Sequence, residues 1–201
     1  MSSPKQNPLL IVLSGPSGAG KDAIINRMRE LKCPIEFITT VTTRPRRVME
    51  RDHIDYYFVS VEQFRQMMAN DEFLEYANVY GNWYGVPKRP IKQALEQGQD
   101  ALVKVDIQGA NTIKKIIPQA VFIFLMTPTI EELKTRLSQR QTETSFDLSL
   151  RLKTAESEVK QLSFFDYVVV NRRGEIDQAV CDINAILRAE KNRVTPREIK
   201  L

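Results

Sequence analysis

The fold is decided near the start of the chain by residues 8–21, PLLIVLSGPSGAGK. Residues 8–14 form a nearly continuous apolar run, which is typical of a strand buried on both faces of a parallel sheet. After the loop, residues 22–31 carry apolar side chains at helical spacing, at Ile24, Ile25, Met28 and Leu31. A strand, a glycine-rich loop and a helix therefore follow one another in the order that a phosphate-binding loop requires.

The loop itself has the pattern Gly-x4-Gly-Lys, from Gly15 to Lys21. In such loops the backbone N–H groups point inward around a β-phosphate, and the glycines let the chain turn without side-chain clashes. Lys21 would place a positive charge on the β- and γ-phosphate oxygens, and the following helix offers its N-terminus to the anion. A glycine-rich turn of chance composition is the alternative, and the flanking strand and helix argue against it. We predict that nucleotide phosphates bind at Gly15, Pro16, Ser17, Gly18, Ala19, Gly20, Lys21 and Asp22.

The residue after Lys21 departs from the usual pattern. That position ordinarily carries Ser or Thr, whose hydroxyl binds magnesium, and here it is Asp22. A carboxylate is a good hard ligand for magnesium, directly or through water, and it also adds negative charge near a triphosphate. We therefore expect Asp22 to hold magnesium, bound as Mg-ATP, with an altered metal dependence.

The rest of the chain alternates strand-like and helical segments. We expect strands at residues 36–43, 54–59, 73–80, 100–106, 120–125 and 167–170, and helices at 61–70, 90–97, 130–140, 145–162 and 176–191. Strands that alternate with helices indicate an α/β fold with a parallel sheet flanked by helices. Residues 37–84 break this rhythm and predict a small inserted β-rich lobe.

Composition excludes several classes of protein. The chain has 201 residues, of which 42% are hydrophobic and 27% charged, as in ordinary globular domains. Its two cysteines, Cys33 and Cys181, are far apart and match no zinc pattern, which predicts reduced thiols. We find no signal peptide and no apolar run of membrane-spanning length, so we expect a soluble, cytoplasmic monomer or homodimer without membrane partners.

The charge pattern favours phosphates over nucleic acid. The net charge is +4, but the arginines gather in two local groups, at residues 44–51 and 136–151. Such groups suit a few phosphates better than a duplex backbone, so nucleic acid is not an expected partner.

Five further fragments follow the loop in order: residues 42–47 (TTRPRR), 55–60 (DYYFVS), 73–75 (FLE), 81–85 (GNWYG) and 105–109 (VDIQG). Together with the loop, this set resembles the guanylate kinases over residues 9 to about 193. The resemblance implies a nucleoside-monophosphate kinase that transfers the γ-phosphoryl group of ATP to GMP, with dGMP as a plausible acceptor. It also implies one domain of the phosphate-loop NTPase type, with a core at 8–36, 87–130 and 163–193, a GMP-binding lobe at 37–86 and a helical lid at 131–162.

The resemblance also implies an acceptor site. It assigns the GMP phosphate to Arg44, Arg47, Tyr56 and Tyr84, because guanidinium forks and phenol hydroxyls suit phosphate oxygens. An exposed charge run is the alternative for the two arginines. It assigns guanine to Glu75, whose carboxylate can accept from N1–H and the 2-amino group together.

Other positions carry smaller roles. The resemblance places Asp106 on the base, with the ordering of magnesium-bound water as the alternative role, and it adds Thr40, Gly85 and Val86 to the GMP site. Three positions depart from the family pattern. Thr40 stands where serine is common, Val86 where Ser or Thr is common, and Lys104 where an acid is frequent.

The lid supplies the remaining charges. Arg136, Arg140 and Arg151 resemble lid arginines that close over the transferring phosphoryl group, although an exposed basic helix face is the alternative for Arg136. The implied catalytic set is Lys21, Arg44, Arg136, Arg140 and Arg151, and Asn171 is placed near the adenine of ATP. The acceptor is already an anion, so no general base is needed and the single histidine, His53, receives no role.

Two rival interpretations stay open. One is a kinase for ribose 1,5-bisphosphate on the same frame, against which the tyrosines and Glu75 argue. The other is a non-catalytic guanylate kinase-like module that binds phosphorylated peptides, against which the intact Lys21 loop and the lid arginines argue.

Overall fold

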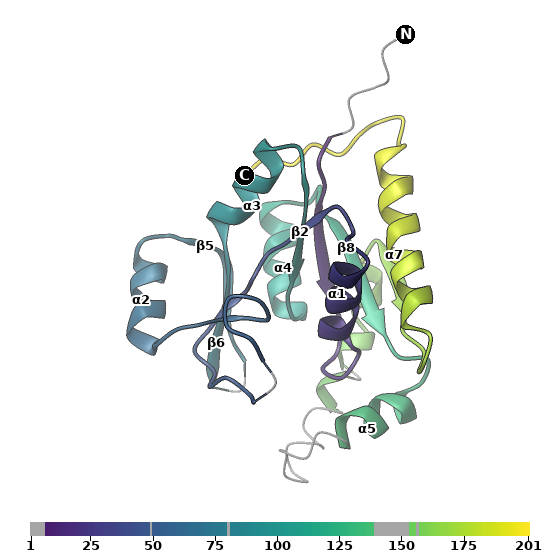
Figure 1. Ribbon diagram of the computed structural model, residues 1–201, viewed down its shortest axis with the longest axis horizontal. Helices are drawn as coiled ribbons and strands as arrows, with labels where there is room; N and C mark the ends of the chain where they lie inside the picture. Colours follow the sequence, from purple (N-terminus) through teal and green to yellow (C-terminus); the bar gives the residue numbers. More distant parts are fainter. Residues whose placement is uncertain (1–6, 49, 80, 139–152, 156) are drawn as a thin grey trace.

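Two β-sheets organise the molecule in the computed structural model, which describes residues 7–48, 50–79, 81–138, 153–155 and 157–201 (Figure 1). The larger sheet is parallel and has the strand order β2-β7-β1-β8-β9. Its strands are β1 (Leu10–Ser14), β2 (Ile35–Phe37), β7 (Asp100–Lys104), β8 (Val121–Met126) and β9 (Tyr167–Val170). The strand order reverses direction at β1, so the carboxyl end of β1 is where such a sheet places its ligands.

Helices cover both faces of this sheet because alternate side chains of β1 point to opposite sides. Leu10 and Val12 lie in one buried cluster with α3 (Lys88–Glu96) and α4 (Ile107–Ile116). Ile11 and Leu13 lie in a second cluster with α1 (Lys21–Glu30) and α7 (Ile176–Lys191). The predicted α/β fold, a parallel sheet flanked by helices, is confirmed.

The smaller sheet forms a lobe on one side of the molecule (Figure 1). Its strand order is β4-β3-β6-β5, with β3 (Val41–Thr42), β4 (Tyr57–Phe58), β5 (Phe73–Val79) and β6 (Asn82–Pro87). Helix α2 (Val61–Ala69) begins with a capping box between Ser60 and Gln63 and packs Phe64 on the sheet. The Phe64 ring stacks on Phe73 at a centroid distance of 4.6 Å. This aromatic cluster gives the lobe a hydrophobic centre of its own.

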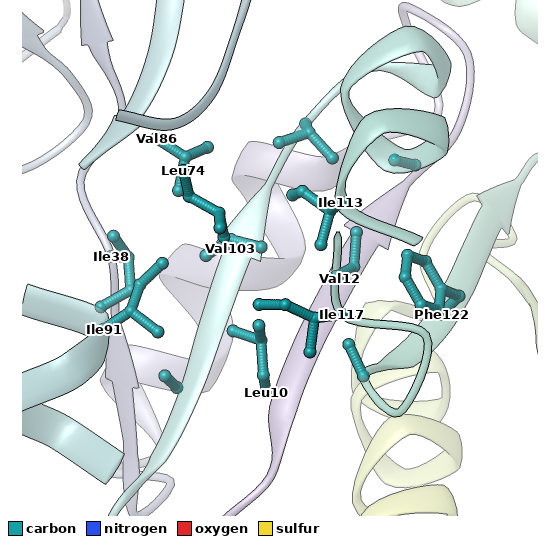
Figure 2. Close-up of a cluster of buried hydrophobic side chains, with 14 of the residues drawn as sticks. Leu10, Val12, Ile38, Leu74, Val86, Ile91, Val103, Ile113, Ile117 and Phe122 are labelled. Carbon is teal, nitrogen blue, oxygen red and sulfur yellow. The ribbon is translucent and has the colours of Figure 1, made fainter. Parts of the chain in front are cut away.

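The lobe and the main sheet share one hydrophobic seam. Leu74 of β5 and Val86 of β6 pack in the cluster that also holds Ile38, Val103 and Ile91 (Figure 2). All five side chains are buried, at 6% exposure or less. The lobe strands that carry the predicted guanine site therefore rest directly on β7 and α3.

Three expected elements differ from the structure. The expected strand at 36–43 is two strands, because residues 38–40 cross from one sheet to the other. The Ile38 N–H still donates to Leu102 O of the larger sheet, whereas Thr40 O accepts from Tyr57 N–H of the smaller sheet. The expected strand at 54–59 is only β4, because a turn with Asp55 N–H on Arg51 O precedes it. Helix α3 begins two residues earlier than expected, with Pro90 in its first turn.

Helix α4 was missing from the sequence expectations. Its signal is present, since Asp106 is its N-cap and Ile107, Ala110 and Ile113 repeat at helical spacing on its buried face. Further along, α5 (Ile130–Ser138), β9 and α7 agree with the expected ranges within the described residues, and a short 3-10 helix, η1 (Leu162–Phe164), leads into β9. None of the described helices has the length and apolar character needed to cross a membrane.

Candidate active site

The phosphate loop joins β1 to α1 and depends on glycine at its two ends. Gly15 has φ of 139°, and a Cβ there would lie 2.0 Å from Leu125 O. Gly20 has φ of 99°, and a Cβ there would lie 2.3 Å from the Asn171 side-chain nitrogen. A side chain at Gly15 would push the loop away from β8, and one at Gly20 would displace the Asn171 amide, so the backbone angle and the close approach both favour glycine at these positions.

Lys21 is the first residue of α1 and curls back over its own loop. Its Nζ donates to Gly15 O at 2.5 Å and to Pro16 O at 3.1 Å. Burial lowers the pKa of Lys21, and the nearby carboxylate of Glu158 acts in the opposite direction. The ammonium therefore lies against the backbone of the loop, with the Gly15 and Pro16 carbonyls as its partners.

Asp22 follows on α1 and pairs with Lys104, the last residue of β7. Lys104 Nζ donates to Asp22 Oδ1 at 2.5 Å. The same ammonium lies 3.9 Å from the centroid of the Tyr56 ring. Burial lowers the pKa of Lys104, but Tyr56 and Asp22 outweigh burial and the net shift is upward, so the side chain stays charged.

The predicted acceptor-phosphate residues gather on the lobe side of this pair. Arg44 forms an ion pair with Glu50 at 2.7 Å, and its guanidinium carbon lies 5.4 Å from the Tyr56 ring centroid. The rings of Tyr56 and Tyr84 meet edge to face, with centroids 6.1 Å apart. Arg47 is exposed, and its backbone N–H donates to Glu50. Three of the four predicted residues thus form one group, and Arg47 lies at its rim.

Glu75 is the buried acid of the site. It is 5% exposed, and its Oε2 has no hydrogen-bond partner among the described residues. Burial raises its pKa to about 8, and the nearby charge of Asp106 adds to the rise. Asp106 itself caps α4, where its Oδ1 accepts from Gly109 N–H at 2.8 Å. A buried carboxyl group without a partner is costly, which points to a bound group that supplies the missing donors.

Three further predicted GMP residues have packing contacts of their own. Thr40 donates from Oγ1 to Lys104 O at 3.3 Å, and Val86 is buried in the seam of Figure 2. A Cβ at Gly85 would lie 2.7 Å from the Phe73 ring, so packing alone demands glycine there. Their roles in binding GMP stay predictions.

Arg136 and Asn171 brace the phosphate loop from the lid side. Arg136 donates to Ala19 O at 3.3 Å and to Asn171 O at 2.8 Å, and it pairs with Glu132. Asn171 donates from Nδ2 to the same Ala19 carbonyl at 2.8 Å. Arg140 and Arg151, the other two predicted lid arginines, lie outside the described residues.

A cavity of about 290 Å³ lies beside Arg136 and Asn171. It lies between α5 and the segment that follows β9, and its lining includes Thr135, Arg136, Asn171 and Arg172. Thr135 and Arg172 were not among the sequence candidates. No motif marks them, because each becomes a lining residue only when the end of β9 meets α5.

Sequence reasoning also missed the charged role of two other residues. Lys104 was noted only as a departure from the family pattern, and its contact with Asp22 joins residues 82 positions apart. Glu158 carried no signal at all. Burial raises its pKa to about 7, while the positive charge of Lys21 acts to lower it.

A phosphate loop at the carboxyl end of a parallel sheet, opposite a lobe that presents cations and a buried acid, defines a phosphate-loop kinase for a small anionic acceptor. The comparisons with known proteins are more specific. The guanylate kinase family model matches residues 7–190. The chain therefore belongs to the guanylate kinase family, and the predicted enzyme class, an ATP:GMP phosphotransferase, is confirmed.

Individual relatives agree along nearly the whole chain. Guanylate kinase 2, chloroplastic/mitochondrial, from Oryza sativa subsp. japonica is 44% identical over 99% of this chain and 70% of its own length. A guanylate kinase from Carboxydothermus hydrogenoformans is 43% identical over 91% of this chain and 89% of its own. The crystal structure of guanylate kinase from Anaplasma phagocytophilum superposes with a TM-score of 0.78 at 34% identity, covering 94% of this chain and 89% of that one.

Proposed function

We propose that this chain transfers the γ-phosphoryl group of Mg-ATP to GMP and dGMP, and that Glu75 selects the guanine base. The observation that carries the proposal is the buried carboxyl group of Glu75, whose Oε2 has no hydrogen-bond partner in the described part of the chain. Guanine offers donors at N1 and at the 2-amino group, and an ionised carboxylate can accept from both. Adenine offers no such pair, so AMP would leave the buried acid unpaired.

The acceptor phosphate is assigned to Arg44, Arg47, Tyr56 and Tyr84. Arg44 and the two tyrosines already lie together, which supports a single anion site on the lobe. Arg44 is held by Glu50, and a phosphate would compete with that carboxylate for the guanidinium. These contacts involve only the base and the phosphate, so a deoxyribose in place of ribose would be tolerated.

The donor side is assigned to the phosphate loop, with Lys21 on the β- and γ-phosphate oxygens. Arg136 and Asn171 hold the loop carbonyl of Ala19, and the adjoining cavity is of suitable size for a nucleoside. We assign that cavity to the adenosine of ATP, with Asn171 at its edge. Arg140 and Arg151 stay predicted lid residues.

Magnesium fits this site as an ion brought in by the nucleotide. The described residues contain no group of three or more His, Cys, Asp or Glu side chains that could hold a metal on their own. Magnesium commonly takes one or two carboxylates together with substrate phosphates and water. Asp22 and Asp106 are the residues that would hold it, and the ion would supply neutralisation of the triphosphate charge.

The reaction needs positioning and charge neutralisation more than covalent chemistry. An oxygen of the GMP phosphate forms the new bond to the γ-phosphorus, and the bond to the β-bridging oxygen breaks, so ADP leaves with that electron pair. Lys21 and Arg136 would offset the charge that spreads over the transferred group. We propose that the lobe at residues 37–86 and the lid at 131–162 close over the core and exclude water during transfer.

The test is ADP production from Mg-ATP with GMP, dGMP, AMP, UMP, CMP and ribose 1,5-bisphosphate as separate acceptors. We expect turnover with GMP and dGMP, and a fall of about 100-fold or more in kcat/KM for GMP in Glu75→Gln. Glu72→Gln is the matched control, because Glu72 is exposed and directly precedes the strand β5 that carries Glu75. This variant should retain full activity. Turnover only with ribose 1,5-bisphosphate, or none with any acceptor, would favour one of the two rival interpretations.

A further inference from the structure

Lys104 and Asp22 form an ion pair that joins the core strand β7 to the phosphate-loop helix. The Nζ–Oδ1 distance is 2.5 Å, and the Lys104 side chain is only 11% exposed. A lysine buried to this degree must keep its ammonium paired, and Asp22 supplies the negative partner. The pair therefore fixes the ammonium beside the N-terminus of α1.

The other side of the same ammonium faces the lobe. Lys104 Nζ lies 3.9 Å from the Tyr56 ring centroid, within cation–π distance, and the Arg44 guanidinium lies 5.4 Å from that ring. Thr40 holds the Lys104 backbone through its carbonyl oxygen. The ammonium thus stands between the phosphate loop and the residues that we assign to the acceptor phosphate.

Charged groups of both signs gather around this point. Lys21, Lys104 and Arg44 bring three cationic groups to this region, and repulsion by Lys104 adds to burial, the main cause of the lowered pKa of Lys21. Asp22 pairs with Lys104 and Glu50 pairs with Arg44, while Glu158 and Asp106 act on Lys21 as nearby negative charges. Cations gathered in this way are stabilised when an anion enters between them.

We propose that Lys104 is a catalytic residue that binds the phosphate of the acceptor nucleotide from the side facing the phosphate loop, and that Asp22 is its positioning residue. The inference rests on the proposed function, since it deepens the acceptor site named there. It also accounts for two departures from the family pattern at once. A carboxylate stands at position 22 and a lysine stands at position 104, and the two side chains touch.

A different role would leave the same contacts. Lys104 could have a purely structural role, in which it holds β7, α1 and the lobe together without touching the substrate. The two roles predict different effects on ligands with and without a phosphate. A structural role supports the whole GMP site, whereas a phosphate-binding role affects only ligands that carry the phosphate. Guanosine, which has the base but no phosphate, separates them.

The experiment measures the dissociation constants of GMP and guanosine by titration calorimetry, without ATP or magnesium, so that metal binding by Asp22 cannot contribute. In Lys104→Met we expect GMP binding to weaken roughly 10- to 100-fold while guanosine binding is unchanged. Lys104→Arg should restore most of the GMP affinity, and Asp22→Asn should show a smaller loss confined to GMP. In turnover assays kcat should fall in Lys104→Met as well.

Lys114→Met is the matched control. Lys114 also lies over aromatic rings, with Nζ 4.8 Å from the Phe122 centroid, and pairs with an acid, Asp166, away from the site. That variant should bind GMP as the unchanged chain does. Thermal unfolding of each variant checks that it is folded. If Lys104→Met does not fold, the dissociation constants of Lys104→Arg still test the proposal.

Equal losses for GMP and guanosine, or no loss for either, would overturn the proposal. These outcomes are distinct from a failure of the proposed function. In that case the unchanged chain itself would bind or phosphorylate no GMP. A chain that phosphorylates GMP normally, with a Lys104→Met variant of full activity, would reject only the role of Lys104.

Discussion

The carboxyl group of Glu75 on β5 packs against the bare Cα of Gly109 on α4. A Cβ at Gly109 would lie 2.9 Å from Glu75 Cδ and from one carboxyl oxygen. Contacts this short are not tolerated, so the position of the acid depends on the absence of a side chain on the helix. The helix in turn begins at Asp106, whose side chain accepts from Gly109 N–H.

Gly109→Ala should therefore damage guanine binding while leaving the donor site intact. The added methyl group would displace the Glu75 carboxylate, and a shift that breaks one of its two hydrogen bonds to guanine would weaken GMP binding about tenfold. The measurements are GMP and ATP dissociation constants. Gln108→Ala, an exposed position on the same helix, serves as the control. Equal losses for GMP and ATP would mean that the helix is damaged as a whole.

The raised pKa of Glu75 predicts a pH dependence for base binding. With a pKa of about 8 in the free protein, the carboxyl group is mostly protonated at pH 7, whereas guanine needs the ionised form. Binding must then release a proton, and affinity should fall about fivefold from pH 8 to pH 7. Guanosine is the suitable ligand because it carries no phosphate that titrates in this range.

Calorimetry in buffers of different ionisation enthalpy measures the proton release directly. In Glu75→Gln both the release and the slope with pH should disappear. Guanosine affinity that stays flat between pH 6.5 and 8.5 in the unchanged chain would contradict the assignment of Glu75.

Much of the core could be predicted because buried parallel strands and phosphate loops have strong local patterns. Residues 8–21 place β1 and the loop, and the structure agrees. Helix α4 was overlooked although Asp106 and the apolar spacing mark it, so that error lay in the interpretation. The split between β2 and β3 has no local signal, because it depends on the switch of residues 38–40 from one sheet to the other.

The site residues also fall into two groups, those marked by a local sequence pattern and those whose role depends on contacts between distant segments. Lys21 and Glu75 sit within motifs and could be named from the sequence. The contact between Lys104 and Asp22, and the approach of Glu158 to Lys21, arise only when distant segments meet. A sequence pattern indicates which residue stands at a position, but a pairing across 82 positions is a property of the folded chain.

Arg136→Met should weaken ATP binding more than GMP binding. The guanidinium joins Ala19 O of the phosphate loop to Asn171 O beyond β9, so its loss frees the Asn171 carbonyl, leaves Ala19 O with the Asn171 amide, and loosens the loop. We expect the KM for ATP to rise by roughly tenfold, with a fall in kcat from the lost positive charge. Lys134→Met removes an exposed charge from the same helix and should change neither constant. An unchanged KM for ATP would contradict this role and indicate that Arg136 belongs to a basic helix face that takes no part in ATP binding.

The final prediction concerns stability and the C-terminal segment. Arg197 donates from Nε and Nη2 to both oxygens of Glu190, each at 2.8 Å, and from Nη1 to Ala120 O at 3.0 Å. The side chain of Glu190 is fully buried. Removing Arg197 leaves the buried carboxylate with only the Tyr167 hydroxyl and the half-exposed Arg193 as partners, and breaking a buried pair in this way costs about 3 kcal/mol. Arg197→Met should lower the free energy of unfolding at pH 7 by about that amount.

The pH dependence of this loss identifies its cause. The hydrogen bonds from Arg197 hold the pKa of Glu190 below its usual value, so the folded state favours the carboxylate. That stabilisation is present above the unfolded pKa near 4.5 and is lost as the pH falls through the lower folded value. The difference between Arg197→Met and the unchanged chain should therefore shrink below pH 4.5. Denaturant unfolding at pH 7 and pH 4 measures it, with Arg193→Met, a half-exposed partner of the same acid, as control. A loss of equal size at both pH values would show that packing of the C-terminal segment, and not the charge of Glu190, sets the cost.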